Sequence, residues 1–110
     1  MEKIDREKLR ELMSLGKVSV IDVLSSQSFL KEHITGSISM PFNELENEGW
    51  KKLDRNKIVV PYCAGLNCHA SHRAGEILEA AGLKVMVYEG GLEDWKRSGY
   101  PMEGASYPSK

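Results

Sequence analysis

Short apolar runs alternate along the chain with segments whose apolar residues recur at helical spacing. β-Branched residues are frequent in the runs at 18–23 ("VSVIDV") and 57–62 ("KIVVPY"), which favours buried strands. Weaker strand patterns occupy 36–41 ("GSISMP") and 84–89 ("KVMVYE"). Pro61 counts against full pairing of the second run, because proline donates no backbone hydrogen bond. The pattern predicts several short strands separated by helical segments.

Helices are expected at 4–16, 25–33, 42–53, 71–82 and 92–99. In the first, Asp5 can cap the N-terminus, and Ile4 before the cap can pack on Leu9 as a hydrophobic staple. The second helix is short and is expected to carry Phe29 and Leu30 inward. Strands that alternate with helices in this way indicate an α/β domain with a largely parallel sheet.

Length and charge narrow the class of protein. The chain has 110 residues, enough for one domain, which we assign to residues 1–103, with a loosely ordered tail at 104–110. A net charge of −1 gives no reason to expect nucleic acid or an anionic membrane as a partner. No apolar run approaches the roughly 18 residues that span a bilayer. The charged N-terminus "MEKIDREKLRELM" is unlike a signal peptide, so we expect a cytoplasmic protein.

The two cysteines of the chain, Cys63 and Cys68, follow the second apolar run in a stretch of small and polar residues. This stretch lies where a strand ends and a helix soon begins, a usual ligand-binding position in α/β proteins. Loop amides and a helix N-terminus stabilise anions there, thiolates included, so a cysteine in this stretch is a candidate nucleophile. If the loop is curled, it also brings the two Cα atoms within the roughly 7 Å that a disulfide requires.

The same stretch offers a metal site as a second interpretation. Cys63, Cys68, His69 and His72 carry the sulfur and nitrogen ligands that zinc binds. Adjacent ligands at 68 and 69 would strain tetrahedral geometry, so we expect neither a metal nor another cofactor.

Asp22 interrupts an otherwise apolar strand. A buried carboxylate needs hydrogen-bonding partners, and we expect either His33 or backbone amides to supply them.

Three motifs occur in a fixed order along the chain. The segment "VIDVLSSQSFLKEHITGSISMPFNEL" contains Asp22, Val23, His33, Ile34, Gly36, Ser37 and Pro41. "VVPYC" follows, and then "AGLKVMVYEGGLEDWKRSGYP", which contains Gly90, Gly91, Trp95, Gly99 and Pro101. In order and spacing these motifs resemble the signatures of the rhodanese-like sulfurtransferases, over nearly the whole chain. The resemblance implies an α/β fold of three layers, in which helices cover both faces of a central, mostly parallel, five-stranded sheet.

The resemblance also implies a function. Cys63 would be the catalytic nucleophile, which takes a sulfane sulfur from a donor, becomes a persulfide and passes the sulfur to a thiophilic acceptor. The substrate would be bound by Ala64, Gly65, Leu66, Asn67, Cys68, His69 and Ala70, with His72 and Arg73 as secondary candidates. The donor would be thiosulfate or a persulfide, and the acceptor cyanide, a thiol or a protein, with no nucleic acid or membrane partner. We expect a monomer or a weak homodimer.

The active-site loop departs from the family pattern. It is two residues longer than usual, and Ala70 and Leu24 stand where the family often has arginine. "CAGLNCHAS" resembles a variant subgroup with the pattern Cys-x-x-x-x-Cys. Because thiosulfate is an anion, we expect a loop with fewer cations to bind it less well.

Several alternatives stay open at this stage. The segment from Cys68 to Arg73 also reproduces a Cys-x-x-x-x-Arg pattern, although the strand ends well before Cys68 and we prefer Cys63. A phosphatase or arsenate reductase of related architecture would need arginine at the position of His69. A non-catalytic binding or regulatory module and a persulfide carrier between proteins are the remaining alternatives.

Overall fold

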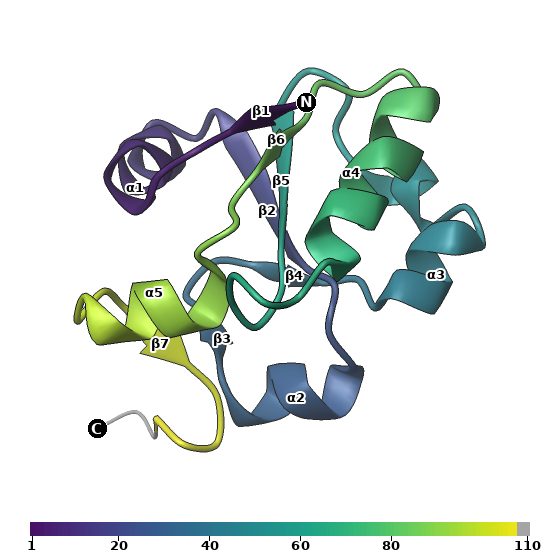
Figure 1. The fold of residues 1–110 in the computed structure, drawn as a ribbon. Coiled ribbons are helices and arrows are strands. Elements are labelled where there is room, and N and C mark those ends of the chain that lie inside the picture. The colour runs from purple at the N-terminus through teal and green to yellow at the C-terminus, as the bar shows by residue number, and fades with distance from the viewer. Residues whose placement is uncertain (108–110) are drawn as a thin grey trace.

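Short parallel strands form the centre of the fold (Figure 1). The structure is a computed structural model that describes residues 1–107. Its strands are β1 Glu2–Lys3, β2 Val18–Asp22, β3 His33–Ile34, β4 Ile38–Ser39, β5 Ile58–Tyr62, β6 Met86–Val87 and β7 Met102–Glu103. Its helices are α1 Arg6–Ser14, α2 Ser26–Lys31, α3 Phe42–Glu46, α4 Ala70–Ala80 and α5 Gly91–Arg97, with a 3₁₀ helix η1 at Gly49–Lys52.

The sheet is parallel throughout the order β4-β2-β5-β6-β1. β2 pairs along its whole length with β5, from Val18 opposite Ile58 to Asp22 opposite Tyr62, and on its other edge with β4. A parallel bridge between Val59 and Val85 joins β5 to the pair formed by β6 and β1. Apart from this sheet, β3 and β7 form a small antiparallel pair. The predicted five-stranded, mostly parallel sheet is confirmed.

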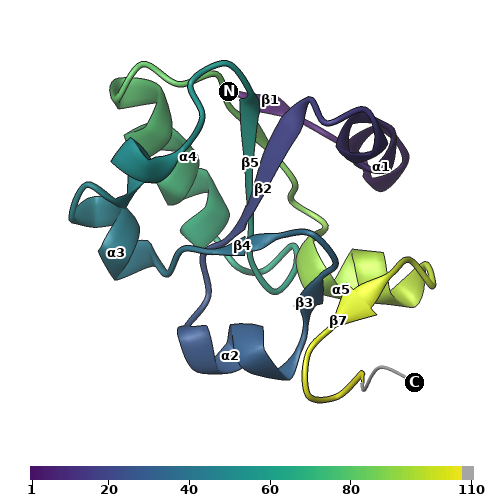
Figure 2. The ribbon, with the colours of Figure 1, turned by 180° about the vertical axis from the view of Figure 1, so that it is seen from behind.

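Helices cover both faces of this sheet, as the alternating side chains of β5 require. Val59 and Cys63 pack in a core cluster with residues of α3 and α4. Val60 and Tyr62 pack in a second cluster with residues of α1 and α5. Figures 1 and 2 show α3 and α4 on one side of β2 and β5, and α1 and α5 on the other. The three-layer α/β architecture is therefore as predicted.

The start of α1 confirms the capping pattern in the sequence. The Asp5 side chain accepts a hydrogen bond of 2.8 Å from the amide of Lys8 and so caps the helix. Ile4 and Leu9 are both buried in the same core cluster, as a hydrophobic staple requires. At the other end of the chain, Trp95 of α5 is 2% exposed and fills the same cluster.

Leu30 is the clearest error of the sequence-based description. It was expected to point inward from α2, but it is 68% exposed, and α2 contains no buried residue. Phe29 instead stacks on the imidazole of His33, with ring centroids 3.7 Å apart. The helix is only six residues long, and Leu30, about 100° around the helix axis from Phe29, faces solvent.

Pro61 lies in the central strand in spite of its missing amide. In a parallel strand alternate residues direct their backbone groups to the same neighbour, and Val59 donates to the carbonyl of Lys84 on the β6 side. The amide that Pro61 lacks would face that side, where β6 extends over two residues instead of the predicted 84–89. Pairing there is already irregular, and the carbonyl of Pro61 still accepts a hydrogen bond of 3.2 Å from Tyr88. The proline is tolerated for this reason.

The segment after β7 returns along α2. Ala105 and Ser106 donate backbone hydrogen bonds of 2.9 and 3.0 Å to the carbonyls of Leu30 and Lys31. Residues 108–110, the rest of the expected tail, lie outside the described residues. Within residues 1–107, no helix has the length and apolar character needed to cross a bilayer.

Candidate active site

Cys63 is the first residue after β5, at the carboxyl end of the central strand. It is 1% exposed and packs in the cluster that lies between the sheet and α4. A loop of residues 64–69 leads from it to the N-terminus of α4. The chain thus places a sulfur atom where α/β proteins commonly bind ligands.

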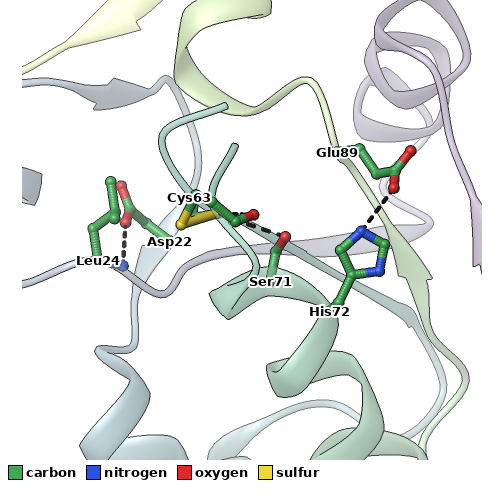
Figure 3. The surroundings of a disulfide bond; sticks show 7 residues. Asp22, Leu24, Cys63, Ser71, His72 and Glu89 are labelled. Atoms are coloured by element: carbon green, nitrogen blue, oxygen red, sulfur yellow. Dashed lines mark hydrogen bonds and ion pairs between the residues drawn. A yellow bond between two sulfur atoms is a disulfide. The ribbon is translucent and has the colours of Figure 1, made fainter. Parts of the chain in front are cut away.

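A disulfide joins Cys63 to Cys68, across the loop (Figure 3). The two Cα atoms are 6.3 Å apart, within the range that a bridge needs. The loop is curled by a turn in which the amide of Cys68 donates a hydrogen bond of 3.0 Å to the carbonyl of Gly65. The expectation that a curled loop brings both cysteines into bonding range is confirmed.

Ser71 is a neighbour of the site that sequence reasoning did not include. Its hydroxyl oxygen lies 3.7 Å from the Sγ atom of Cys63, and its residue is 1% exposed (Figure 3). The carbonyl oxygen of Cys68 lies 3.2 Å from the same sulfur. The signal in the sequence was that Ser71 lies at helical spacing from Ala74 and Leu78, on the buried face of α4, where a hydroxyl needs a partner.

The N-terminal end of α5 fixes the start of the loop. The amides of Leu92 and Glu93 donate hydrogen bonds of 3.0 and 2.9 Å to the carbonyls of Cys63 and Ala64. Gly91 has a φ of +61°, and a Cβ atom there would collide with the Cys63 carbonyl and lie 2.9 Å from the Gly65 nitrogen. Only glycine fits at this close approach, which explains the need for Gly91.

The other predicted loop residues differ in exposure. Gly65 is buried, Cys68 and Ala70 are half-buried, and Ala64, Leu66, Asn67 and His69 are exposed. Leu66 has the largest exposed fraction among the exposed large apolar side chains of the described residues, 73%. The exposed residues of the predicted substrate-binding segment therefore face solvent, and Cys63 is buried behind them.

A cleft of about 410 Å³ lies beside the loop, between the start of α1 and α5. Leu66 and Asn67 form part of its lining, together with Ile4, Asp5, Arg6, Tyr88, Glu89, Gly90, Glu93, Asp94 and Arg97. Both arginines of the lining are paired: Arg6 donates to Asp94 at 2.9 Å, and Arg97 binds Glu93. Since the lining holds four carboxylates against two arginines, its formal charge is negative.

The family model for the rhodanese-like domain matches residues 5–98, most of the chain. The chain belongs to the rhodanese-like domain family. Among solved structures it resembles a protein of Bacillus halodurans (BH2092), with 26% identity, 96% of this chain and 78% of that one covered, and a TM-score of 0.89. It also resembles a rhodanese-related protein of Thermoplasma volcanium, with 33% identity, 94% and 98% coverage and a TM-score of 0.82.

A curated relative of this rhodanese-like domain is the uncharacterized protein slr1261 of Synechocystis. The two are 34% identical over 94 residues, which is 84% of this chain and 51% of the relative. The chain therefore spans about half the length of the curated relative that it matches.

A residue of the first signature, Asp22, contacts the end of β5, the strand that precedes Cys63. Asp22 is fully buried, and its carboxylate accepts hydrogen bonds from the Tyr62 hydroxyl at 3.0 Å and the Leu24 amide at 2.9 Å. The expected backbone amide is present (Figure 3). The expected His33 is not the partner, because its Nδ1 lies 2.7 Å from the carbonyl of Phe29. Burial raises the pKa of Asp22 above its usual value, against the opposing effect of these hydrogen bonds.

Tyr62 is the partner that sequence reasoning missed. Its hydroxyl also accepts a hydrogen bond of 3.1 Å from the Ile34 amide and lies 3.0 Å from the Ser37 hydroxyl. A tyrosine next to the cysteine in "VVPYC" was the signal, since a buried tyrosine hydroxyl usually finds a partner. Tyr62, the residue before Cys63, thus joins Asp22 near the start of the first signature to Ile34 and Ser37 further along it.

The side chains of His72 and Arg73, the two secondary candidates, contact different parts of the structure. The Nε2 atom of His72 is 2.7 Å from Glu89, a residue of the cleft lining, and points to it in Figure 3. Burial tends to raise the pKa of Glu89, but Lys3 and His72 outweigh it and lower that pKa. Arg73 is exposed, and its guanidinium lies 4.9 Å from the centroid of the Phe42 ring in α3.

The four residues considered for zinc do not form a metal site in this structure. The two cysteines are bonded to each other, and His72 is paired with Glu89. Among residues 1–107, no group of three or more histidine, cysteine, aspartate or glutamate side chains is arranged to hold a metal ion.

Proposed function

We propose that the protein is a sulfurtransferase of the rhodanese type, which carries a sulfane sulfur on Cys63. The observation that supports this most directly is the place of Cys63. It lies behind a curled loop at the end of β5, with the Ser71 hydroxyl 3.7 Å away and the Leu92 amide of α5 donating to its carbonyl. A thiolate in such a place is a nucleophile towards sulfur.

The transfer takes place in two displacements on sulfur. The Cys63 thiolate attacks the outer sulfur of a persulfide donor, so that a bond from Cys63 Sγ to that sulfur forms and the donor leaves as a thiolate. An acceptor then attacks the outer sulfur of the Cys63 persulfide, and Cys63 leaves as a thiolate. Cyanide would yield thiocyanate, and a thiol would yield a new persulfide. Each step follows the rules of thiol–disulfide exchange.

Several finer points belong to this proposal. The donor is a small persulfide or thiosulfate, the acceptor is a thiol or a protein, and the protein acts without a cofactor in the cytoplasm as a monomer or weak homodimer. The residues that bind the substrate are those of the loop 64–70. His72 contributes by fixing Glu89 at the wall of the cleft.

Intact mass after incubation with a sulfur donor tests the proposal. The protein is first reduced and desalted, and is then mixed with a small persulfide. One sulfur added to Cys63 raises the mass of Cys68→Ser, in which no second cysteine can remove it, by about 32 Da, and the further change Cys63→Ser should remove this gain. A mass that stays unchanged with every donor tried would instead favour a non-catalytic binding module.

A further inference from the structure

We infer that Cys68 reduces the Cys63 persulfide from within the loop, so that the protein releases sulfide as a persulfide reductase. The inference rests on the proposed persulfide at Cys63 and adds a second half-reaction to it. Its basis is that Cys68 Sγ is bonded to Cys63 Sγ within the folded loop, with the Cα atoms 6.3 Å apart. Cys68 is therefore an acceptor that the chain itself supplies.

The reaction is balanced without an external oxidant. The Cys68 thiolate attacks Sγ of the Cys63 persulfide, and the bond between the two cysteine sulfurs forms. The bond from Cys63 Sγ to the sulfane sulfur breaks, and that sulfur leaves with the electron pair as hydrosulfide. The sulfane sulfur is reduced to sulfide, and the two cysteines are oxidised to the disulfide seen in the structure.

The fold favours attack on the inner sulfur of the persulfide. Cys63 Sγ is the atom that Cys68 contacts, and its position is fixed by the strand behind it and by the Leu92 amide on its carbonyl. Cys68 closes the turn that begins at Gly65, so its side chain is brought towards that sulfur by a backbone hydrogen bond of 3.0 Å. Attack on the outer sulfur would instead move the sulfur to Cys68.

Burial determines how the disulfide is opened again. Cys63 is 1% exposed, whereas Cys68 is half-buried, so an external thiol meets Cys68. Its attack forms a mixed disulfide at Cys68 and releases Cys63 as a thiolate, to which the Ser71 hydroxyl can donate a hydrogen bond. A second external thiol then attacks the external sulfur of the mixed disulfide. Cys68 leaves as a thiolate, and the two external thiols leave as their disulfide. The complete cycle converts one persulfide sulfur to sulfide and consumes two thiols.

A single-turnover experiment tests this second half-reaction. Reduced, desalted wild type, Cys68→Ser and Cys63→Ser are each mixed with one equivalent of a small persulfide, and sulfide and intact mass are measured without added reductant. The wild type should release close to one sulfide per chain and end about 2 Da below its reduced mass. Cys68→Ser should keep a gain of about 32 Da and release almost no sulfide. Cys63→Ser should neither gain sulfur nor release sulfide. The thiol left by the donor is the same in wild type and Cys68→Ser, so it cannot account for a difference between them.

Other outcomes separate this inference from the proposed function. If wild type and Cys68→Ser both hold the added sulfur and release no sulfide, the inference is wrong and the sulfurtransferase proposal stands. Peptide mapping that places the added sulfur on Cys68 also overturns the inference. If neither protein takes up sulfur or releases sulfide, the proposed function itself fails. Cys68→Ala, measured in parallel, guards against an effect peculiar to serine.

Discussion

Cys63 and Cys68 are chemically identical, but their surroundings differ, and we propose different roles for them. Cys63 is buried at the end of β5, and Cys68 lies half-buried on the loop. In the reduced protein, Cys63→Ser should abolish the cyanide-dependent formation of thiocyanate, because a hydroxyl cannot carry a sulfane sulfur. Cys68→Ser, the matched control, should retain this activity, since cyanide takes the sulfur directly from Cys63. Thiocyanate formation retained within a few-fold by Cys63→Ser would transfer the nucleophile to Cys68.

Asp22 is expected to contribute to stability more than to chemistry. Asp22→Ala removes the acceptor of the Tyr62 hydroxyl and the Leu24 amide and leaves both groups unsatisfied in the core. The free energy of unfolding should fall by about 1–3 kcal/mol in a denaturant titration. Sulfur uptake at Cys63, measured at a temperature where the variant is folded, should change little. Lost uptake with unchanged stability would mean that Asp22 acts in the site.

The pH dependence of stability follows from the raised pKa of Asp22. The ionised form is less favourable in the folded protein than in the unfolded chain, where the pKa is near 3.8. The contribution of Asp22 to stability is therefore greatest below pH 3.8 and is lost as the pH rises through the folded-state value. Asp22→Asn does not titrate, so its stability relative to wild type should increase as the pH rises from 3.8. A constant difference across this range, in denaturant titrations at several pH values, would contradict the assignment.

At the scale of residues, the sequence pointed to the proposed nucleophile, Cys63, but not to most of the residues that contact and position it. Cys63 stood out because it ends a strand and precedes a helix. The contact of Tyr62 with Asp22 joins positions 40 residues apart along the chain. The contact of Ser71 with Cys63 spans only eight residues but depends on how the loop between them curls. A pattern of neighbours in sequence cannot select Tyr62 over His33, because the tertiary fold decides which of the two side chains contacts Asp22.

At the scale of elements, the N-terminus of α5 holds the loop that carries the site. Gly91→Ala should place a Cβ against the Cys63 carbonyl and impose an alanine on a φ of +61°. Gly99→Ala is a matched control, because Gly99 has a φ of +75° and nothing lies within 4 Å of the added Cβ. Both variants should lose about 1–2 kcal/mol of stability from backbone strain. Only Gly91→Ala should also slow sulfur uptake at Cys63 by an order of magnitude or more, measured by intact mass over time. Equal uptake by the two variants would show that the loop does not depend on this contact.

Elements with a strong local signal were predicted well, and weak ones were not. α1 has a cap at Asp5 and a clear apolar stripe, and β2 and β5 are dominated by β-branched residues, so local preference and burial agree there. α2 and β6 are shorter, with six and two residues, and their limits are set by what they pack against. The exposure of Leu30 and the tolerance of Pro61 both follow from such tertiary surroundings.

At the scale of the whole molecule, the sheet brings together two signatures that are distant in sequence. The first signature supplies Asp22 on β2, and the last supplies Gly91 at the start of α5. Asp22 reaches the strand of Cys63 from one side through Tyr62, and the α5 amides reach the loop from the other. The cysteine is thereby fixed by the packing of the complete domain, which explains why no local pattern around Cys63 was sufficient to describe the site.

The charge of the cleft gives an expectation about the sulfur donor. Thiosulfate carries negative charge and would approach a lining of four carboxylates, in which both arginines are already paired. In addition, Ala70 and Leu24 stand at the two positions where the rhodanese-like family often has arginine. A small persulfide whose one charge is on its sulfur carries less negative charge than thiosulfate, a dianion, and should therefore give a higher kcat/KM.

Ionic strength and one substitution make this expectation specific to the cleft. Salt should raise kcat/KM for thiosulfate, because it screens repulsion between like charges, and should raise it less for a persulfide with a single negative charge. Glu93→Gln removes one carboxylate and weakens the hold on Arg97, so it should improve the use of thiosulfate several-fold. Glu11→Gln on α1, outside the cleft lining, is the control and should have no such effect. Steady-state rates with thiosulfate and with the persulfide, measured for wild type, Glu93→Gln and Glu11→Gln, test this expectation. A higher kcat/KM for thiosulfate in the wild type would mean that an exposed hydrogen-bond donor such as the His69 side chain reaches the anion and outweighs the acidic lining.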